Sequence, residues 1–258
     1  MLVAVLVAFM VMNLVYLLVR WTGRVAIVDV GWAYGVVLVL FLYASAGTGE
    51  PWRRVLLLVM GGGWGLRLGT HLLTDRVLRG AEDGRYVALM KHWGKGAGRK
   101  MFWFHQAQAV LVVVMSLPFY SIANGLESAL RVWDIAALAL WLVSIAGEAL
   151  ADRQLARWRS DPANAGRTCN SGLWRYSRHP NYFFEWLHWW AYVLLGLSAP
   201  HGWLTLIGPV LMFAFLFRFT GIPYAETQAL RSRGEDYARY QRTTNRFFPW
   251  RPKKELQQ

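Results

Sequence analysis

Leu2-Val-Ala-Val-Leu-Val-Ala-Phe-Met-Val-Met-Asn-Leu-Val-Tyr-Leu-Leu-Val19 contains no charged residue and decides the fold class of this chain. A run of about 20 apolar residues is what the ~30 Å hydrocarbon layer of a membrane requires of a helix. Comparable runs occur at Val110–Tyr120 and Leu204–Phe217. The core of a soluble domain would have to absorb all of these runs, so the sequence predicts lipid as the solvent.

The composition points the same way. The 258 residues are 55% hydrophobic and include 15 Trp, and the mean hydropathy is +0.26, which is high for a soluble chain of this length. We predict an all-α membrane protein with about seven transmembrane helices, forming a single domain over 1–258. The predicted spans lie near residues 2–19, 25–45, 55–75, 101–121, 132–150, 181–199 and 203–220, followed by a polar tail.

The basic residues predict the orientation. Of the 28 Lys and Arg residues, all except Arg53, Arg54, Arg67 and Arg131 fall in the turn after the first span, in two later loops, or in the tail. Basic loops stay in the cytoplasm, so we expect an N-terminus outside and a cytoplasmic C-terminus. The net charge of +13 is explained by this topology and predicts no nucleic-acid partner. The single Cys169 predicts no disulfide.

Polar residues at membrane depth are the first functional candidates, because an ionisable group there is costly unless it faces a cavity or a partner. Asp29 lies in the second predicted span, Arg67 and His71 lie four apart in the third, and Glu185 and His188 lie in the sixth. The structural alternative for Asp29 is a buried ion pair with Arg67. For His188, which is surrounded by Trp, it is an interfacial aromatic belt.

The densest polar stretch runs from Ser171 to Glu185 and reads Ser-Gly-Leu-Trp-Arg-Tyr-Ser-Arg-His-Pro-Asn-Tyr-Phe-Phe-Glu. Arg guanidinium groups match phosphate oxygens, Tyr176 and Trp174 offer stacking faces, and Asn181 can make a two-way amide contact. The set favours a nucleotide-like cofactor. The alternative is a basic loop that contacts lipid headgroups, but headgroups require only Lys or Arg.

Gly-Leu-Trp-Arg-Tyr-Ser-Arg-His-Pro-Asn-Tyr at 172–182 resembles the signature of the bacterial DUF1295 membrane proteins, which are similar to the steroid 5α-reductases. The resemblance extends to Gly-Ile-Pro-Tyr-Ala-Glu at 221–226, to the 237–250 segment and to Asp-Val-Gly-Trp at 29–32. It implies a protein of the bacterial inner membrane. The Arg-His-Pro core also resembles the isoprenylcysteine carboxyl methyltransferases.

The resemblance implies a site for NADPH. Asp152 and Arg159 match residues for its adenosine-phosphate half, and Asn181 and Glu185 match residues beside its nicotinamide. The remaining implied cofactor residues are Arg167, Tyr176, Arg178, His179, Arg218 and Glu226. Asp29 stands where the reductases carry an acid for the substrate oxygen, whereas Trp64 replaces their Tyr. Trp32 and Trp64 are the predicted walls of the substrate slot.

The chemistry predicted for this set is reduction of a carbon–carbon double bond conjugated to a carbonyl. It requires hydride at one end of the conjugated system and a hydrogen-bond donor at the oxygen. The predicted catalytic residues are Asp29, as a protonated acid away from the basic loops, with His71 as the alternative donor, and Glu185. No metal is predicted. We expect a monomer acting on a lipid-soluble enone, most simply a Δ4-3-oxo steroid.

Two alternatives are open. One is an S-adenosylmethionine-dependent membrane methyltransferase, although fewer phosphate-matching Arg residues would be expected for it. The other is a transporter or lipid-binding protein, whose repeated Gly/Pro-broken helices are absent from the sequence, where Gly61-Gly-Gly63 is a single break.

Overall fold

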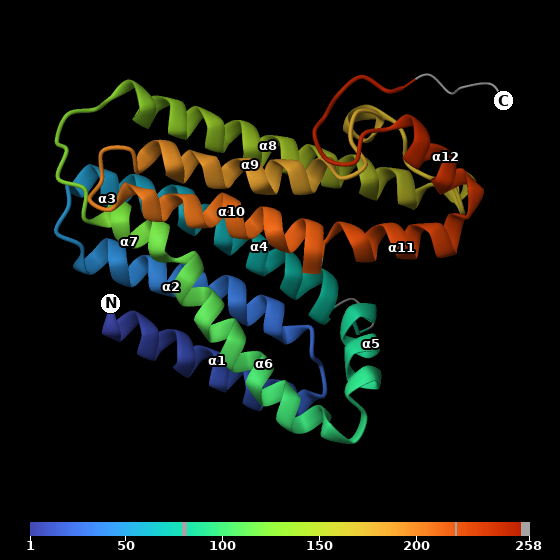
Figure 1. The fold of residues 1–258 in the computed structure, drawn as a ribbon, viewed down its shortest axis with the longest axis horizontal. Coiled ribbons are helices and arrows are strands. Elements are labelled where there is room, and N and C mark those ends of the chain that lie inside the picture. Colours follow the sequence, from blue (N-terminus) through green and yellow to red (C-terminus); the bar gives the residue numbers. More distant parts are fainter. Residues whose placement is uncertain (79–81, 220, 254–258) are drawn as a thin grey trace. The chain divides into compact units, whose positions relative to one another are not determined.

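All regular structure in the described part of the chain is helical, as Figure 1 shows. The computed structural model describes residues 1–78, 82–219 and 221–253. Six helical stretches are long and apolar enough to cross a membrane: Leu2–Thr22, Ile27–Ala46, Pro51–Leu78, Gly84–Ala123, Val132–Ser160 and Gly202–Arg233. The predicted all-α membrane fold is confirmed, and the predicted count of about seven spans is close.

The difference in count comes from α9 (Pro180–Leu195), the helix of the predicted span 181–199. Its 16 residues rise only about 24 Å at 1.5 Å per residue, which is less than the ~30 Å hydrocarbon layer. The helix ends early, and the Leu195 carbonyl at its last turn accepts a hydrogen bond from Arg53 Nη1 at 3.0 Å. Arg53 is fully buried, and its Nε also donates to the Glu127 carbonyl at 3.1 Å.

The contacts within the chain gather into two compact units, and the prediction of one domain stays a prediction. The first unit comprises Met1–Arg131 and Leu195–Ile207. Its α-helices are α1 (Leu2–Thr22), α2 (Ile27–Ala46), α3 (Pro51–Leu57), α4 (Gly63–Leu72), α5 (Gly84–Trp93), α6 (Ala97–Met115) and α7 (Leu117–Ala123). A π-helical turn at Leu58–Gly62 joins α3 to α4. The three glycines from Gly61 to Gly63 therefore do not interrupt the helical stretch.

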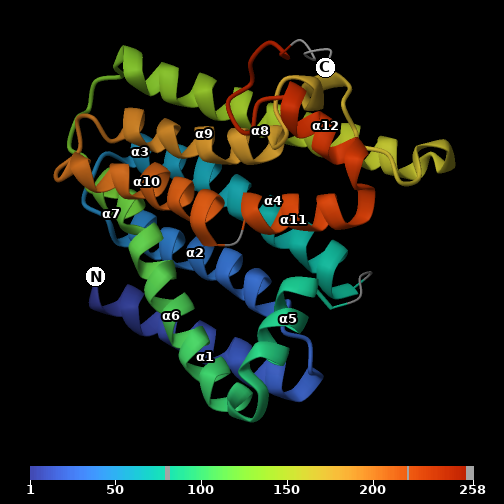
Figure 2. The same ribbon diagram turned by 45° about the vertical axis from the view of Figure 1, so that its right-hand side comes forward.

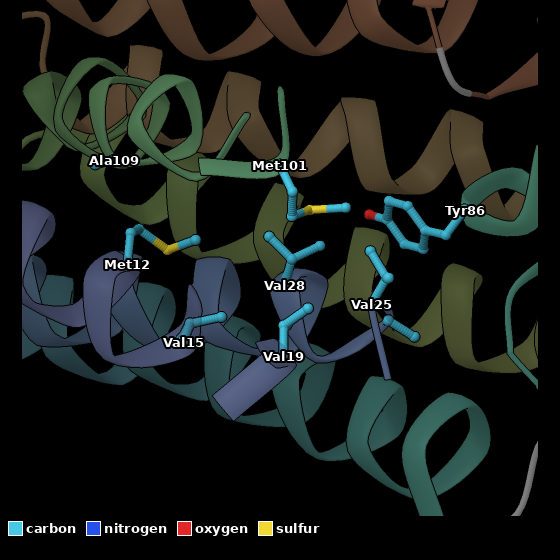
Figure 3. Packing of buried hydrophobic residues seen from close by; sticks show 9 residues of the cluster. Met12, Val15, Val19, Val25, Val28, Tyr86, Met101 and Ala109 are labelled. Atoms are coloured by element: carbon cyan, nitrogen blue, oxygen red, sulfur yellow. The ribbon is translucent and has the colours of Figure 1, made fainter. Parts of the chain in front are cut away.

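The core of the first unit forms where α1, α2 and α6 pack together (Figures 1 and 2). Met12, Val15 and Val19 repeat at helical spacing along one face of α1 and meet Val28 of α2 and Met101 of α6, as Figure 3 shows. The opposite face of α1 is an exposed apolar stripe that includes Leu6, Met10, Leu14, Leu17 and Trp21. A helix this apolar on both faces is suited to lipid.

Small residues set the spacing of α2 and α4 in the same unit. A Cβ on Gly65 would lie 2.4 Å from the Val37 side chain, and one on Gly69 would lie 2.5 Å from the Tyr34 ring. Both distances are too short for a real contact, so these helices approach through glycine, as membrane helices commonly do.

The second unit comprises Val132–Leu194 and Gly208–Gln258. Its α-helices are α8 (Val132–Ser160), most of α9, α10 (Ile207–Ala214, whose first residue belongs to the first unit), α11 (Ile222–Arg233) and α12 (Glu235–Thr243). Gly147 of α8 packs against the Phe184 ring of α9, and Gly208 of α10 packs against Trp189 of α9. Helix α9 therefore lies between α8 and α10 (Figures 1 and 2). The predicted polar tail is itself folded, since α11 and α12 occupy most of it.

Candidate functional site

Asp152 and Asn181 are joined in the second unit. Asn181 Nδ2 donates to Asp152 Oδ1 at 3.1 Å, across a sequence separation of 29. Asn181 lies in the first turn of α9, directly after Pro180, and Asp152 lies in the polar C-terminal part of α8. Glu185, with a side chain 13% exposed, lies four residues after Asn181, which places both on one face of α9.

The loop between α8 and α9 folds back onto α8. Leu173 N donates to Gln154 Oε1 at 2.8 Å, and Trp174 Nε1 donates to the Ala151 carbonyl at 2.9 Å. Gly172 makes this approach possible, because its φ is 58° and a Cβ at this position would lie 2.5 Å from the Gln154 side chain. The loop is thereby held beside Asp152.

Several predicted cofactor residues present open side chains in this unit. Arg159, Arg167, Tyr176 and Arg218 are exposed, and their side chains make no hydrogen bond or ion pair with another residue among those described. Guanidinium donors without a protein acceptor are suited to phosphate oxygens. The structure thus leaves these residues available for a ligand.

Arg178, His179 and Glu226 are instead occupied by one another. Arg178 Nε donates to Glu226 Oε1 at 2.7 Å, and the two side chains are only 10% and 12% exposed. Arg178 Nη1 also donates to the carbonyls of Gln241 and Thr244, at 2.8 and 2.9 Å. We call Arg178, His179, Glu226 and Gln241 the Glu226 network, because Gln241 Nε2 donates to the second Glu226 oxygen at 3.3 Å.

His179 belongs to this network through its ring. Burial lowers the pKa of His179 below its usual value, and its Nε2 lies 3.3 Å from Glu226 Oε1, within hydrogen-bonding distance. The ring stacks on Tyr182 at 5.5 Å between centroids. The Arg-His-Pro motif therefore ties α11 and α12 to the start of α9, while its predicted contact with a cofactor stays a prediction.

Residues 245–253, which we call the tail strap, are bonded to the same loop. Arg178 N donates to the Asn245 carbonyl at 2.8 Å, Ser177 Oγ to the Phe247 carbonyl at 2.7 Å, and Trp250 N to the Tyr176 carbonyl at 3.0 Å. The loop before α9 is thus fixed on one side by α8 and on the other by the end of the chain.

In the first unit, Asp29 lies in the first turn of α2 and not deep within the span. Arg76 Nη1 and Arg85 Nη2 donate to Asp29 Oδ2 at 2.8 and 3.0 Å, and the Tyr86 hydroxyl donates to Oδ1. We call these four residues with Asp83 the Asp29 network, since Asp83 Oδ2 accepts from Arg85 Nη2 at 2.8 Å and lies 3.3 Å from Arg76 Nη1. The expectation that Asp29 lies away from the basic loops is wrong, and the arginines that hold it are Arg76 and Arg85, where the sequence suggested Arg67.

The other candidates of the first unit are placed as follows. Trp32 and Trp64 meet edge to face, with 6.5 Å between ring centroids and an interplanar angle of 89°. His71 has a side chain 50% exposed, and its Nε2 lies 3.8 Å from the Asp75 carboxylate. The two predicted walls of the substrate slot therefore touch, and His71 keeps an accessible ring.

The partners of Asp29 were not predicted from the sequence. Arg76, Arg85 and Tyr86 lie about 50 residues away from it along the chain. Glu82 was missed as well, although its carboxylate accepts from the amides of Val25 and Ala26 at the start of α2. A signal existed, because Glu82-Asp-Gly-Arg-Tyr86 places two acids in an otherwise basic loop.

Comparison with known proteins gives a family. Residues 15–244 match the family described as "Protein of unknown function (DUF1295)". An uncharacterized protein of Schizosaccharomyces pombe (strain 972) is 28% identical over 280 aligned residues, which cover 96% of this chain and 79% of the relative. No solved structure matches. The predicted resemblance to DUF1295 is confirmed, and the resemblance to the steroid 5α-reductases stays a prediction.

Proposed function

From the premise that this chain belongs to the DUF1295 family, we propose that it is an NADPH-dependent reductase of the carbon–carbon double bond of a lipophilic enone, most simply a Δ4-3-oxo steroid. The observation that supports this most is the hydrogen bond between Asp152 and Asn181. It joins two of the residues that the resemblance matches to the cofactor site, with Glu185 on the next turn of α9.

The residues of this region suit a dinucleotide phosphate. Asp152 offers carboxylate oxygens to ribose or adenine donors, and the open guanidinium groups of Arg159 and Arg167 suit phosphates. Asn181 has a carboxamide whose oxygen already accepts from the Tyr182 amide at 3.0 Å, which fixes its orientation. NADPH, when bound, supplies the hydride.

The protein would supply a donor near the substrate oxygen. Asp29 and His71 are the two candidates for this donor. Two guanidinium groups already donate to Asp29, whereas His71 keeps an accessible ring. Trp32 and Trp64 present aromatic surface to an apolar substrate. A substrate of this class is already dissolved in the bilayer, so a membrane-embedded enzyme meets it at high local concentration.

We propose the orientation that the basic loops predict, with the N-terminus outside and the C-terminus in the bacterial cytoplasm. This orientation requires a seventh crossing, because six crossings would leave both termini on one side of the membrane. In this proposal α9, with the residues that flank it, supplies the seventh crossing. On this orientation, the cofactor arrives from the cytoplasm at the loop beside Asp152.

NADPH should bind at least about tenfold more tightly than NADH, because the 2′-phosphate adds at least one charge-assisted hydrogen bond to Arg. Calorimetry in detergent measures both affinities, and consumption of NADPH with progesterone measures turnover. Equal affinities would contradict the proposal. Binding of S-adenosylmethionine in place of NADPH would favour a methyltransferase.

Replacing Asp152, Arg159 or Asn181 by Ala should weaken NADPH binding by about 1.5–3 kcal/mol without unfolding the protein. Arg157→Ala is the matched control, because Arg157 is an exposed arginine two residues from Arg159 on α8. Melting temperature in detergent checks the fold of each variant. If all three variants keep the affinity of the unmodified protein, these residues do not hold the cofactor.

A further inference from the structure

A pocket of about 260 Å³ lies in the second unit, outside the proposed cofactor residues. It is formed by the loop before α9, by α12 and by the tail strap, and the polar side chains that matter here are Thr168, Asn170, Arg175, Asp236, Arg239 and Thr243. None of them belongs to the predicted cofactor set. The proposed function therefore gives this pocket no role.

The pocket carries an excess of positive charge. The Arg175 side chain makes no hydrogen bond or ion pair with another residue of the described chain, whereas Arg239 Nη2 lies 3.5 Å from Asp236 Oδ1. Asp236 is further compensated by the Thr168 amide, which donates to Oδ2 at 2.6 Å. After this pairing, the guanidinium of Arg175 is left over.

More positive charge surrounds the loop that forms one wall. Cys169, between Thr168 and Asn170, is buried, and burial raises the pKa of its thiol while the charges of Arg159 and Arg233 oppose that rise. Arg233 and Arg159, the latter also a proposed cofactor residue, therefore lie near the pocket wall. An anion entering here meets a positive potential.

The frame of the pocket is fixed before any ligand arrives. Lys253 N donates to the Thr243 carbonyl at 2.8 Å, which holds the tail strap against α12. The Tyr240 hydroxyl donates to the Trp174 carbonyl, so the residue before Arg175 is tied to α12 as well. A preorganised frame reduces the ordering cost of binding.

We propose that this pocket binds the phosphate group of a small phosphomonoester, either free in solution or as the headgroup of a lipid. Arg175 and Arg239 supply guanidinium donors that match phosphate oxygens, and Thr243 and Asn170 supply neutral polar groups. The volume is below the ~300–1,000 Å³ of pockets that take drug-sized ligands, so it suits a phosphate with few further atoms and not a whole dinucleotide.

The test uses the full-length protein in detergent, titrated with inorganic phosphate and followed by ³¹P NMR line broadening. Arg175→Ala and Arg239→Ala should each weaken binding at least about tenfold, which corresponds to the loss of one charge-assisted hydrogen bond. Arg231→Ala, an exposed arginine of α11, is the control and should bind phosphate normally. Asp152→Ala should also bind normally, which separates this pocket from the proposed cofactor site.

Nanodiscs of phosphatidylcholine, with and without phosphatidic acid, distinguish the two sources of phosphate. Retention of phosphatidic acid that is lost in Arg175→Ala identifies a lipid headgroup, while binding of inorganic phosphate alone identifies a soluble ligand. The proposal is overturned if the unmodified protein binds neither, or if the Arg175 and Arg239 variants, folded by melting temperature, bind as well as the control. An equal loss in Asp152→Ala would overturn the separation of the two sites.

Discussion

Replacing Glu226 by Ala should lower the free energy of unfolding by roughly 3–5 kcal/mol, because it leaves Arg178 as a buried cation without its carboxylate. Solvent screens this pair little, since the two side chains are 10% and 12% exposed. Melting temperature in detergent measures the effect. The melting temperature of Glu226→Gln should fall between those of Glu226→Ala and the unmodified protein. The glutamine keeps an acceptor for Arg178 and His179 but loses the negative charge.

Glu235→Ala is the matched control for this experiment. Glu235 also pairs with an arginine, Arg242, at 2.6 Å, but the arginine and glutamate side chains are 57% and 78% exposed. Exposed pairs contribute little, so its melting temperature should hardly change. A Glu226→Ala protein that melts like the control but no longer binds NADPH would show that the network serves the cofactor and not the fold.

Asp29→Leu should both destabilise the protein and abolish turnover. It removes the shared acceptor of Arg76, Arg85 and Tyr86. Because the two arginine side chains are partly exposed, solvent offsets part of the loss, and we expect the free energy of unfolding to fall by roughly 1–3 kcal/mol. Asp29→Asn keeps an acceptor and should lose less of both. The measurements are melting temperature and NADPH oxidation with progesterone, each at a temperature where the variants stay folded.

Arg76→Ala gives a graded comparison, because Arg76 is 38% exposed and Arg85 remains on Asp29 after its removal. It should cost less stability than Asp29→Leu. Two outcomes would correct our account. Full turnover in a folded Asp29→Leu protein removes Asp29 from the mechanism, and lost turnover with unchanged melting temperature assigns it a direct role at the substrate.

Local sequence patterns were enough to predict the helices but not their polar partners. Apolar runs place α1 and α2 close to their observed limits, since bilayer thickness fixes the length of a span. They also place the start of α8, but this helix continues past the predicted residue 150 to Ser160. The end of α9 was not predicted. No local signal shows that its last carbonyl accepts a hydrogen bond from Arg53, 142 residues earlier in the chain. Long-range pairing is what a single sequence does not display.

The candidate site was also predicted only in part. The motif around Arg178 is recognisable in the sequence, but Arg178 donates to the main-chain carbonyls of Gln241 and Thr244, which any residue type could supply. The sequence at these two positions therefore does not show that they are partners of Arg178. Asp29 was predicted as a substrate residue for the same reason, because its partners lie in a later loop whose fold the sequence does not reveal.

The tail strap bonds to a loop that is synthesised well before it. A chain is synthesised from its N-terminus at about 5–20 residues per second, so the loop at Tyr176 to Arg178 leaves the ribosome ahead of the strap. Until residues 245–253 have emerged, that loop lacks the hydrogen bonds that the strap supplies. A stop codon ahead of Asn245 would therefore leave the loop beside the proposed cofactor residues without these bonds and more open to proteases.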